Sequence, residues 1–441
     1  MTSPCESTDT LWTAISRISS SINGTQPISR LPPEILAEVF GCYQNLETAG
    51  QRKWYTWIQL MLVSRGWRSI ILSFPSLWSR VYITNEISPE IILMFLQRSG
   101  GHPLDVIIPQ MIHPPTSESN QRFQALEAVS AHASRIRSFV LEDSGEHDTS
   151  LLLRIFSQPA PNLTHLNLWT PRPAGSMPFP TFFGLEFPKL RKLEIKGVGA
   201  WPNILGANLT RITISNTFTP YILSRCIPYS PNLKVLKLLR IWKIRRTDLS
   251  PGQRIALPLG VRLTIKDSPR CPRILDLFSL PQDCHLKIGH PIKLTGNGTP
   301  PLSCVLPDDL SLFQNLRTLV RLHITARFSN KPGLKLKWCG LDRPTLRVNV
   351  EFFKNPRIWE RNGNTVMGFL GDLRPVVLGG VEELRMEGFV GPLEPQAIEL
   401  LKFLEGMPAL TRLITADNNE EVFRSALNDL GCRTVVAKTG A

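Results

Sequence analysis

The chain has 441 residues and a formal net charge of +14 at pH 7, so it is long enough to form two or more folded units. Its hydrophobic content of 42% argues against wholesale disorder. The polar start of the chain lacks the basic and apolar regions of a signal peptide, and no run approaches the roughly 20 apolar residues of a membrane span. These features predict an intracellular protein of the cytoplasm or nucleus, with no membrane partner.

The segment Leu31–Phe40 predicts an amphipathic helix near the start of the chain. Its two prolines suit the first turn of a helix, where a missing N–H costs nothing, and Glu34 complements the positive end of the helix dipole. Apolar residues then follow at i, i+1, i+4 and i+5, which predicts one apolar face. These residues are Ile35, Leu36, Val39 and Phe40.

A second amphipathic run begins 27 residues after Leu36, at Val63, and continues through Trp67, Ile70 and Ile71. The sequence FPSLW follows it. Two short helices cannot bury this much apolar surface between themselves, so part of it is expected to meet a partner.

LPPEIL, V-S-x-x-W and FPSLW together resemble an F-box over Ile28–Ile83, with Ser64 in place of the usual cysteine and an enlarged connection at Leu46–Lys53. The resemblance implies docking to a Skp-type adaptor and, through it, to a cullin. An ordinary helical hairpin packed on the rest of the chain is the alternative. The positions implied at the adaptor interface are Leu31, Pro32, Ile35, Leu36, Val39, Val63 and Trp67.

Farther along, the phrase L-x-x-L-x-L recurs every 19–27 residues, which is typical of leucine-rich repeats. In such a repeat the last two leucines lie in a short strand and point inward, whereas the residues between them face outward. An unrelated α/β domain with coincidental phrases is the alternative, and 281–316 yields no clear repeat. The phrases begin at Leu163, Leu190, Leu209 and Leu233, with weaker copies at Ile136, Gly260, Leu319, Val381 and Leu410.

The predicted fold is therefore α/β: all-α F-box helices, then an irregular leucine-rich-repeat solenoid with parallel strands on its concave face and short helices and loops on its convex face. This order is similar to the expanded F-box families of mushroom-forming fungi. The predicted parts are a polar segment (1–27), the F-box (28–83), a helical linker (84–134), the solenoid (135–430) and a tail (431–441).

Motifs for catalysis, nucleotide binding and metal binding are missing from the sequence. The histidines are scattered, and His165 and His323 fall where a repeat would face outward, so they are predicted to be contact residues or bystanders. The eight cysteines form no C-x-x-C pair and are predicted to be reduced and mostly buried. The sequence therefore predicts a protein that is not an enzyme and binds no cofactor or metal.

Basic charge is concentrated downstream of a neutral N-terminal third. Residues 1–134 hold 9 basic and 10 acidic residues, whereas Lys234–Arg273 holds 11 basic and 2 acidic residues, a net charge of +9. In stacked repeats, six cations would project from the concave face as a trough for an acidic or phosphorylated target. These are Lys192, Lys196, Arg211, Lys237, Arg262 and Lys266.

The predicted function is substrate recognition in an SCF-type ubiquitin ligase. The alternative is a leucine-rich-repeat scaffold that binds nucleic acid or another anionic surface through 234–273. Nucleic acid is the less favoured partner. A further alternative for the basic span is a solvated face without a binding role, because lysine and arginine commonly solvate repeat surfaces and cover apolar neighbours with their stems. An adaptor-bound F-box protein without a role in degradation would have the same sequence features. The sequence does not identify the target.

Overall fold

The computed structural model describes residues 21–22, 25–47, 55–84, 87–109, 119–142, 155–169, 183, 187–197, 208–218, 223–224, 226–244, 254–268, 271–281, 283–292, 321–327, 333–339, 344–352, 379–387, 402–415, 424–425, 428 and 435–438. The chain divides into two compact units, residues 1–166 with 180–184 and residues 167–179 with 185–441. Each unit is described by itself. In the described ranges no helix has the length and apolar character needed to cross a membrane.

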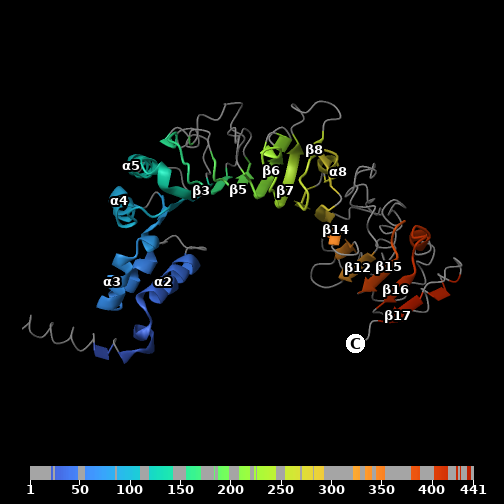
Figure 1. Ribbon diagram of the computed structural model, residues 1–441, viewed down its shortest axis with the longest axis horizontal. Coiled ribbons are helices and arrows are strands. Elements are labelled where there is room, and N and C mark those ends of the chain that lie inside the picture. Colours follow the sequence, from blue (N-terminus) through green and yellow to red (C-terminus); the bar gives the residue numbers. More distant parts are fainter. Residues whose placement is uncertain are drawn as a thin grey trace, which may run out of the picture. The chain divides into compact units, whose positions relative to one another are not determined.

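The first unit combines helices with short parallel strands (Figure 1). Its α-helices are α2 (Pro33–Glu47), α3 (Arg65–Ser73), α4 (Pro89–Arg98) and α5 (Ser119–Ser130). Its 3-10 helices are η1 (Pro27–Arg30), η2 (Thr56–Leu62), η3 (Pro75–Trp78) and η4 (Ala133–Arg135). Strand β2 (Leu104–Ile108) pairs in parallel with β1 (Arg80–Tyr82) and with β3 (Ile136–Glu142). Strand β4 (His165–Trp169) contains the junction between the two units.

The helices of this unit begin where the sequence supplies the right residue. Helices η3 and α4 have a proline in their first turn, where the ring replaces an N–H that has no partner within the helix. Ser64 caps α3, because its hydroxyl accepts a hydrogen bond of 3.1 Å from the N–H of Trp67. The proline positions and the Ser64 cap thus fix the start of three short helices.

An aromatic cluster forms the core between these helices. The rings of Trp57, Trp78 and Phe95 are fully buried and meet edge to face, with centroids 5.0–6.3 Å apart. The indole N–H of Trp78 donates a hydrogen bond of 2.7 Å to the carbonyl of Ile71 at the end of α3. Trp57 and Trp78 are therefore core residues that, with Phe95, join η2, η3 and α4.

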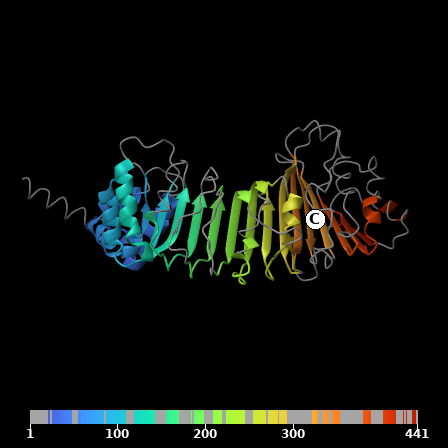
Figure 2. The same ribbon diagram turned by 90° about the horizontal axis from the view of Figure 1, so that it is seen from above.

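The second unit is built on a long row of strands, which lie side by side in Figure 2. In spatial order they are β5 (Lys192–Lys196), β6 (Arg211–Phe218), β7 (Val235–Ile244), β9 (Arg262–Lys266), β11 (His285–Ile292), β14 (Pro344–Phe352), β13 (Gly333–Cys339), β12 (Arg321–Arg327), β15 (Glu383–Glu387), β16 (Arg412–Thr415) and β17 (Val435–Lys438). Strands β8 (Ile255–Ala256) and β10 (Phe278–Ser279) form a separate parallel pair, and α8 (Cys271–Leu275) lies between β9 and β10 in sequence.

Neighbouring strands from β5 to β11 are parallel and in one register, so like side chains form rows across the sheet. The second leucine of each phrase occupies one buried row, and the residue two positions later occupies another. The first row contains Leu193, Ile212, Leu236, Leu263 and Leu286, and the second contains Ile195, Ile214, Leu238, Ile265 and Ile288. On β5, β6, β7 and β9 the L-x-L positions that were expected to face inward are buried.

In three distant parts of the chain, a threonine directly before a strand makes the same two hydrogen bonds. The backbone N–H and the hydroxyl of Thr210 both donate to the carbonyl of Arg191, at 2.8 and 3.1 Å. Thr164 makes the same pair of bonds to Arg137, and Thr411 makes them to Glu382. Each phrase is thus tied to the preceding strand by its backbone and by a side chain.

Four neighbouring strands of the sheet carry a residue with positive φ two positions after the second buried residue, directly after β5 and β9 and within β6 and β7. These are Gly197, Asn216, Arg240 and Asp267, with φ of 78°, 72°, 53° and 54°. Glycine and asparagine tolerate this left-handed conformation, whereas a residue such as arginine loses about 1–2 kcal/mol in it. The recurrence of the same backbone turn shows that the repeat extends beyond the buried leucines.

Replacing Arg240 by glycine should therefore stabilise the protein by about 0.5–1 kcal/mol. The free energy gained by removing the strain at positive φ is larger than the free-energy cost of the extra conformational entropy that glycine has in the unfolded chain. The Arg240 side chain is largely exposed, so few contacts are lost. Urea unfolding of the wild type, Arg240→Gly and Arg240→Ala checks this expectation. Arg240→Ala removes the same side chain but keeps the strain, so a stabilisation of equal size in both variants would contradict it.

The structure corrects the expectation of an all-parallel arrangement. Strand β13 is antiparallel to both β12 and β14, so the chain reverses the spatial order of these three strands. Strand β11 lies within 281–316, where no repeat was predicted, and β2 lies in 84–134, predicted as a helical linker. The predicted tail, 431–441, includes β17.

Other predicted segments fall largely outside the described residues. They are the connection at Leu46–Lys53 and Ser150–Ser157, one of three convex segments, with Pro220–Ile227 and Ile398–Met407, that the sequence predicts as short helices. Of Pro220–Ile227, residues 223, 224 and 226 are helical. Of the predicted helix Ile398–Met407, residues 402–405 are helical.

Candidate adaptor-docking surface

Helix α2 has an inner and an outer apolar face. The inner face is buried and contains Leu36, Ala37 and Phe40. The outer face repeats every four residues and keeps 39–44% of each side chain exposed; it comprises Leu31, just before the helix, and Ile35, Val39 and Tyr43. We call these four residues the outer row.

The inner face holds α2 against its neighbours. The ring of Phe40 lies 4.9 Å from the ring of Trp67 in α3, measured between centroids. The side-chain amide of Gln44 is buried and donates a hydrogen bond of 3.2 Å to the carbonyl of Leu77 in η3. These contacts fix the rotation of α2 about its axis, and this rotation turns the outer row to solvent.

The predicted interface residues therefore separate into two groups. Leu31, Pro32, Ile35 and Val39 are exposed on or beside α2, and Val63 is exposed at the end of η2. Trp67 is half-buried against Phe40. Leu36 is only 3% exposed and belongs to the inner face, so in this structure it offers almost no surface to a partner.

The structure adds exposed apolar residues that the sequence interpretation missed. Tyr43 continues the four-residue spacing of the outer row, and this spacing was a usable signal. Leu62 is 84% exposed and directly precedes Val63 at the end of η2, which packs against α2 and α3. Leu62 and Val63 are thus two adjacent exposed apolar residues, and grouped apolar surface, rather than a single exposed residue, is what marks a binding site.

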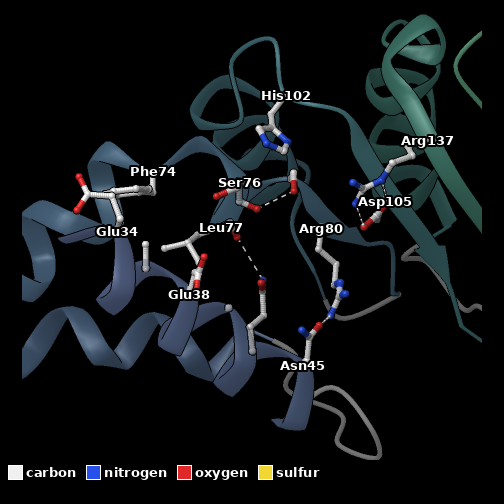
Figure 3. A pocket seen from close by; sticks show the side chains of 14 residues that line it. Glu34, Glu38, Asn45, Phe74, Ser76, Leu77, Arg80, His102, Asp105 and Arg137 are labelled. Carbon is white, nitrogen blue, oxygen red and sulfur yellow. Dashed lines mark hydrogen bonds and ion pairs between the residues drawn. The ribbon is translucent and has the colours of Figure 1, made fainter. Parts of the chain in front are cut away.

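A groove of about 440 Å³ lined by polar and apolar residues lies on another side of α2 (Figure 3). The side chains of Glu34 and Glu38 line it from α2. Farther along the helix, the Arg80 guanidinium of β1 donates to the side-chain oxygen of Asn45. This bond joins the end of α2 to β1, which keeps the helix in place while its outer row stays exposed.

Within the same groove an ion pair connects β2 and β3. The Arg137 guanidinium donates to both carboxylate oxygens of Asp105, at 2.7 and 3.1 Å (Figure 3). These hydrogen bonds raise the pKa of Arg137 above its ordinary value. Each side chain thus neutralises the other, and the pair is a bidentate link between strands.

Metal sites use groups of ligating side chains. The residues that the structure describes contain no group of three or more His, Cys, Asp or Glu side chains that could hold a metal ion. His165 lies half-buried on β4, and the side chain of His323 is outside the described part.

Four cysteines are described as free thiols: Cys42 is exposed, and Cys226, Cys271 and Cys284 are buried. Burial raises the pKa of the Cys226 and Cys284 thiols to about 12 and raises that of Cys271 as well. Because the thiolate is the nucleophile, the buried three are inert near neutral pH.

Iodoacetamide at pH 8 should consequently modify Cys42 and spare the three buried thiols until the protein is unfolded in urea. Peptide mass spectrometry before and after unfolding measures the labelling of each thiol. Rapid modification of Cys226 or Cys284 in the folded protein would contradict their placement in the core.

Comparison with known protein families identifies the helical region. Residues 28–84 match the family described as F-box-like. No match was found when the chain was compared with curated proteins and with solved structures. The chain therefore carries an F-box-like domain that includes α2, η2, α3 and β1, followed by a region of parallel strands. The predicted resemblance to an F-box is confirmed.

The six predicted target-binding cations share the outer face of the sheet in the second unit. They lie on β5, β6, β7 and β9 at positions that alternate with the buried rows. Lys192 is the register partner of Arg211, whereas Lys237 lies between Thr213 and Thr264 on the neighbouring strands. Lys287 of β11 occupies the same row as Lys237 and was missed, because β11 lies in the segment without a recognised repeat.

Proposed function

We propose that this protein is a substrate-recognition subunit of an SCF-type ubiquitin ligase. Its F-box-like domain docks a Skp-type adaptor, which connects the protein to a cullin, and its sheet region binds the target as an irregular leucine-rich-repeat solenoid. The observation that carries the proposal is the outer row of α2, within the residues that match the F-box-like family.

The outer row has the chemistry of a docking surface. Four apolar side chains at one spacing, each about 40% exposed, form a continuous strip on a helix held rigidly by Phe40 and Gln44. Burying such side chains fully contributes about 1.5–3 kcal/mol each relative to water, so completing their burial favours a partner with a complementary apolar groove.

The protein's contribution to ubiquitination is proximity. F-box proteins are typically non-catalytic, and holding a target close to a charged conjugating enzyme raises its effective concentration without chemistry in this chain. Regular phrases, in-register parallel strands and the repeated threonine bonds support the leucine-rich-repeat description of the target-binding region.

Co-expression with a Skp-type adaptor followed by gel filtration tests the proposal. A one-to-one complex that stays together through the column supports it. Recovery of the chain without adaptor, under conditions where a known F-box protein retains its adaptor, would overturn it. A ubiquitination assay with cullin then separates a ligase subunit from an F-box protein that has no role in degradation.

A further inference from the structure

The outer face of the sheet presents two rows of side chains in which cations outnumber carboxylates. The first row runs through Lys192, Arg211, Val235, Arg262 and His285, and the second runs through Glu194, Thr213, Lys237, Thr264 and Lys287. From β6 to β11 the cations alternate between the rows. We call Arg211, Lys237, Arg262 and Lys287 the basic zigzag.

A third outward row contains the cations Lys196 and Lys266, and both of them already contact other side chains of this unit. The Lys196 ammonium lies 3.4 Å from the centroid of the Trp169 ring. Lys266 is 3.8 Å from the Asp267 carboxylate and crosses Gly289, where even a Cβ would come within 3.1 Å of its stem. These two residues, predicted to bind a target, therefore already make contacts within the sheet that binding a target would have to compete with.

The basic zigzag differs from that third row. Among the residues that the structure describes, no carboxylate lies within ion-pair distance of any of its four cations. Arg211, Arg262 and Lys287 are exposed and Lys237 is half-exposed. The sole acidic side chain at the described positions of the two rows is Glu194, at the β5 end. The attraction for an anion is thus concentrated between β6 and β11.

We propose that the basic zigzag binds an acidic segment of a partner protein, running across the strands. This inference rests on the proposed function, in which the sheet region binds the target. At roughly 4.8 Å per strand, the span from β6 to β11 is about 14 Å, close to the length of four to five extended residues. Asp or Glu side chains along such a segment can meet Arg211, Lys237, Arg262 and Lys287 in turn, and the Thr213 and Thr264 hydroxyls can donate further hydrogen bonds.

The spacing favours distributed carboxylates over one phosphate. Arg211 and Arg262 are two strands apart, roughly 10 Å, with the buried Val235 between them. Lys237 and Lys287 are likewise two strands apart. Single charges at this separation match a run of carboxylates, whereas phosphate recognition favours arginines that converge on one group.

A single-stranded nucleic acid is disfavoured by the lack of stacking surfaces. Sequence-tolerant binding of single strands combines cations with exposed aromatic faces. Among the outward side chains that the structure describes on β4 to β11, Trp169 is the sole large aromatic one, and Lys196 covers its ring; the side chains of Phe218 and Trp242 are outside the described part. The basic zigzag itself is bordered by threonines.

The test uses the full chain purified with its Skp-type adaptor and a fluorescein-labelled decaglutamate peptide, with decaglutamine as the neutral probe. Fluorescence anisotropy at low and at 0.5 M salt should show binding of decaglutamate that salt abolishes. Lys237→Glu with Lys287→Glu should weaken binding at least tenfold. Arg254→Glu with Arg273→Glu makes the same change in net charge near β8 and in α8, and should change affinity less than twofold.

Equal weakening by both double variants would overturn the proposal, because net charge alone would then account for binding. Absence of decaglutamate binding would do the same. Displacement of decaglutamate by a 20-nucleotide single-stranded DNA at equal or lower concentration would assign the surface to nucleic acid, and tighter binding of a singly phosphorylated neutral peptide would assign it to phosphate. Adaptor retention, measured in the same preparations, reports separately on the proposed function.

Discussion

Ile35→Asp should reduce the affinity for a Skp-type adaptor at least a hundredfold while leaving the fold intact. Docking would take the new carboxylate out of water without a partner, and such burial costs several kcal/mol. The free protein should tolerate the change. Ile35 is 44% exposed, and it is the third residue of α2, where an acidic side chain is favoured by the helix dipole.

Leu93→Asp is the matched control for this prediction. Leu93 lies on α4, outside residues 28–84, and is exposed to a similar degree. Titration of each variant against the adaptor by calorimetry, with circular dichroism to verify folding, separates the two sites. Unchanged affinity in Ile35→Asp, or an equal loss in Leu93→Asp, would show that the outer row is not the docking surface.

The strand region could be predicted well where the phrases are regular. In L-x-x-L-x-L the i, i+3, i+5 spacing predicts which side chains face the core, and Leu166 and Leu193 are both fully buried as expected. At β11 the buried residues are Cys284, directly before the strand, and Leu286 and Ile288 within it, a spacing of two rather than three at the start. Because of this altered spacing, the L-x-x-L-x-L pattern did not predict the strand, and Lys287 was missed with it.

The reversal at β12, β13 and β14 could not be predicted from local pattern. The sequence GLKLKWC alternates apolar and polar residues, and alternation predicts a strand without giving its direction. Direction depends on which neighbour each strand meets, and β13 meets β12 and β14 in antiparallel register. Such pairing depends on contacts between residues distant in sequence.

In the F-box-like domain, Leu36 shows that helical periodicity alone does not predict which apolar residues face the core. Ile35, Leu36, Val39 and Phe40 cover a wide sector of α2, so the periodicity leaves open which half of the sector faces the core. The ring contact between Phe40 and Trp67 decides it, since it turns Leu36 inward and Ile35 outward. The sequence predicted the helix and an apolar face expected to meet a partner, whereas packing determined which of these residues face solvent.

The strand register itself predicts a large difference between adjacent positions of β5. Leu193 is fully buried and pairs in register with Ile212, whereas Lys192 is exposed and pairs with Arg211. Leu193→Asp should destabilise the second unit by at least about 3 kcal/mol, because an unpaired carboxylate enters the core. Lys192→Asp introduces the same residue one position earlier and should cost less than about 1 kcal/mol, the scale of strand propensity.

Limited proteolysis and urea unfolding of both variants, each purified with adaptor, measure this difference. Cleavage within the second unit should accelerate strongly in Leu193→Asp and little in Lys192→Asp. Adaptor binding should persist in both variants, because the F-box-like residues 28–84 belong to the first unit. Equal destabilisation at the two positions would refute the register, and with it the placement of Arg211, Lys237, Arg262 and Lys287 on one face.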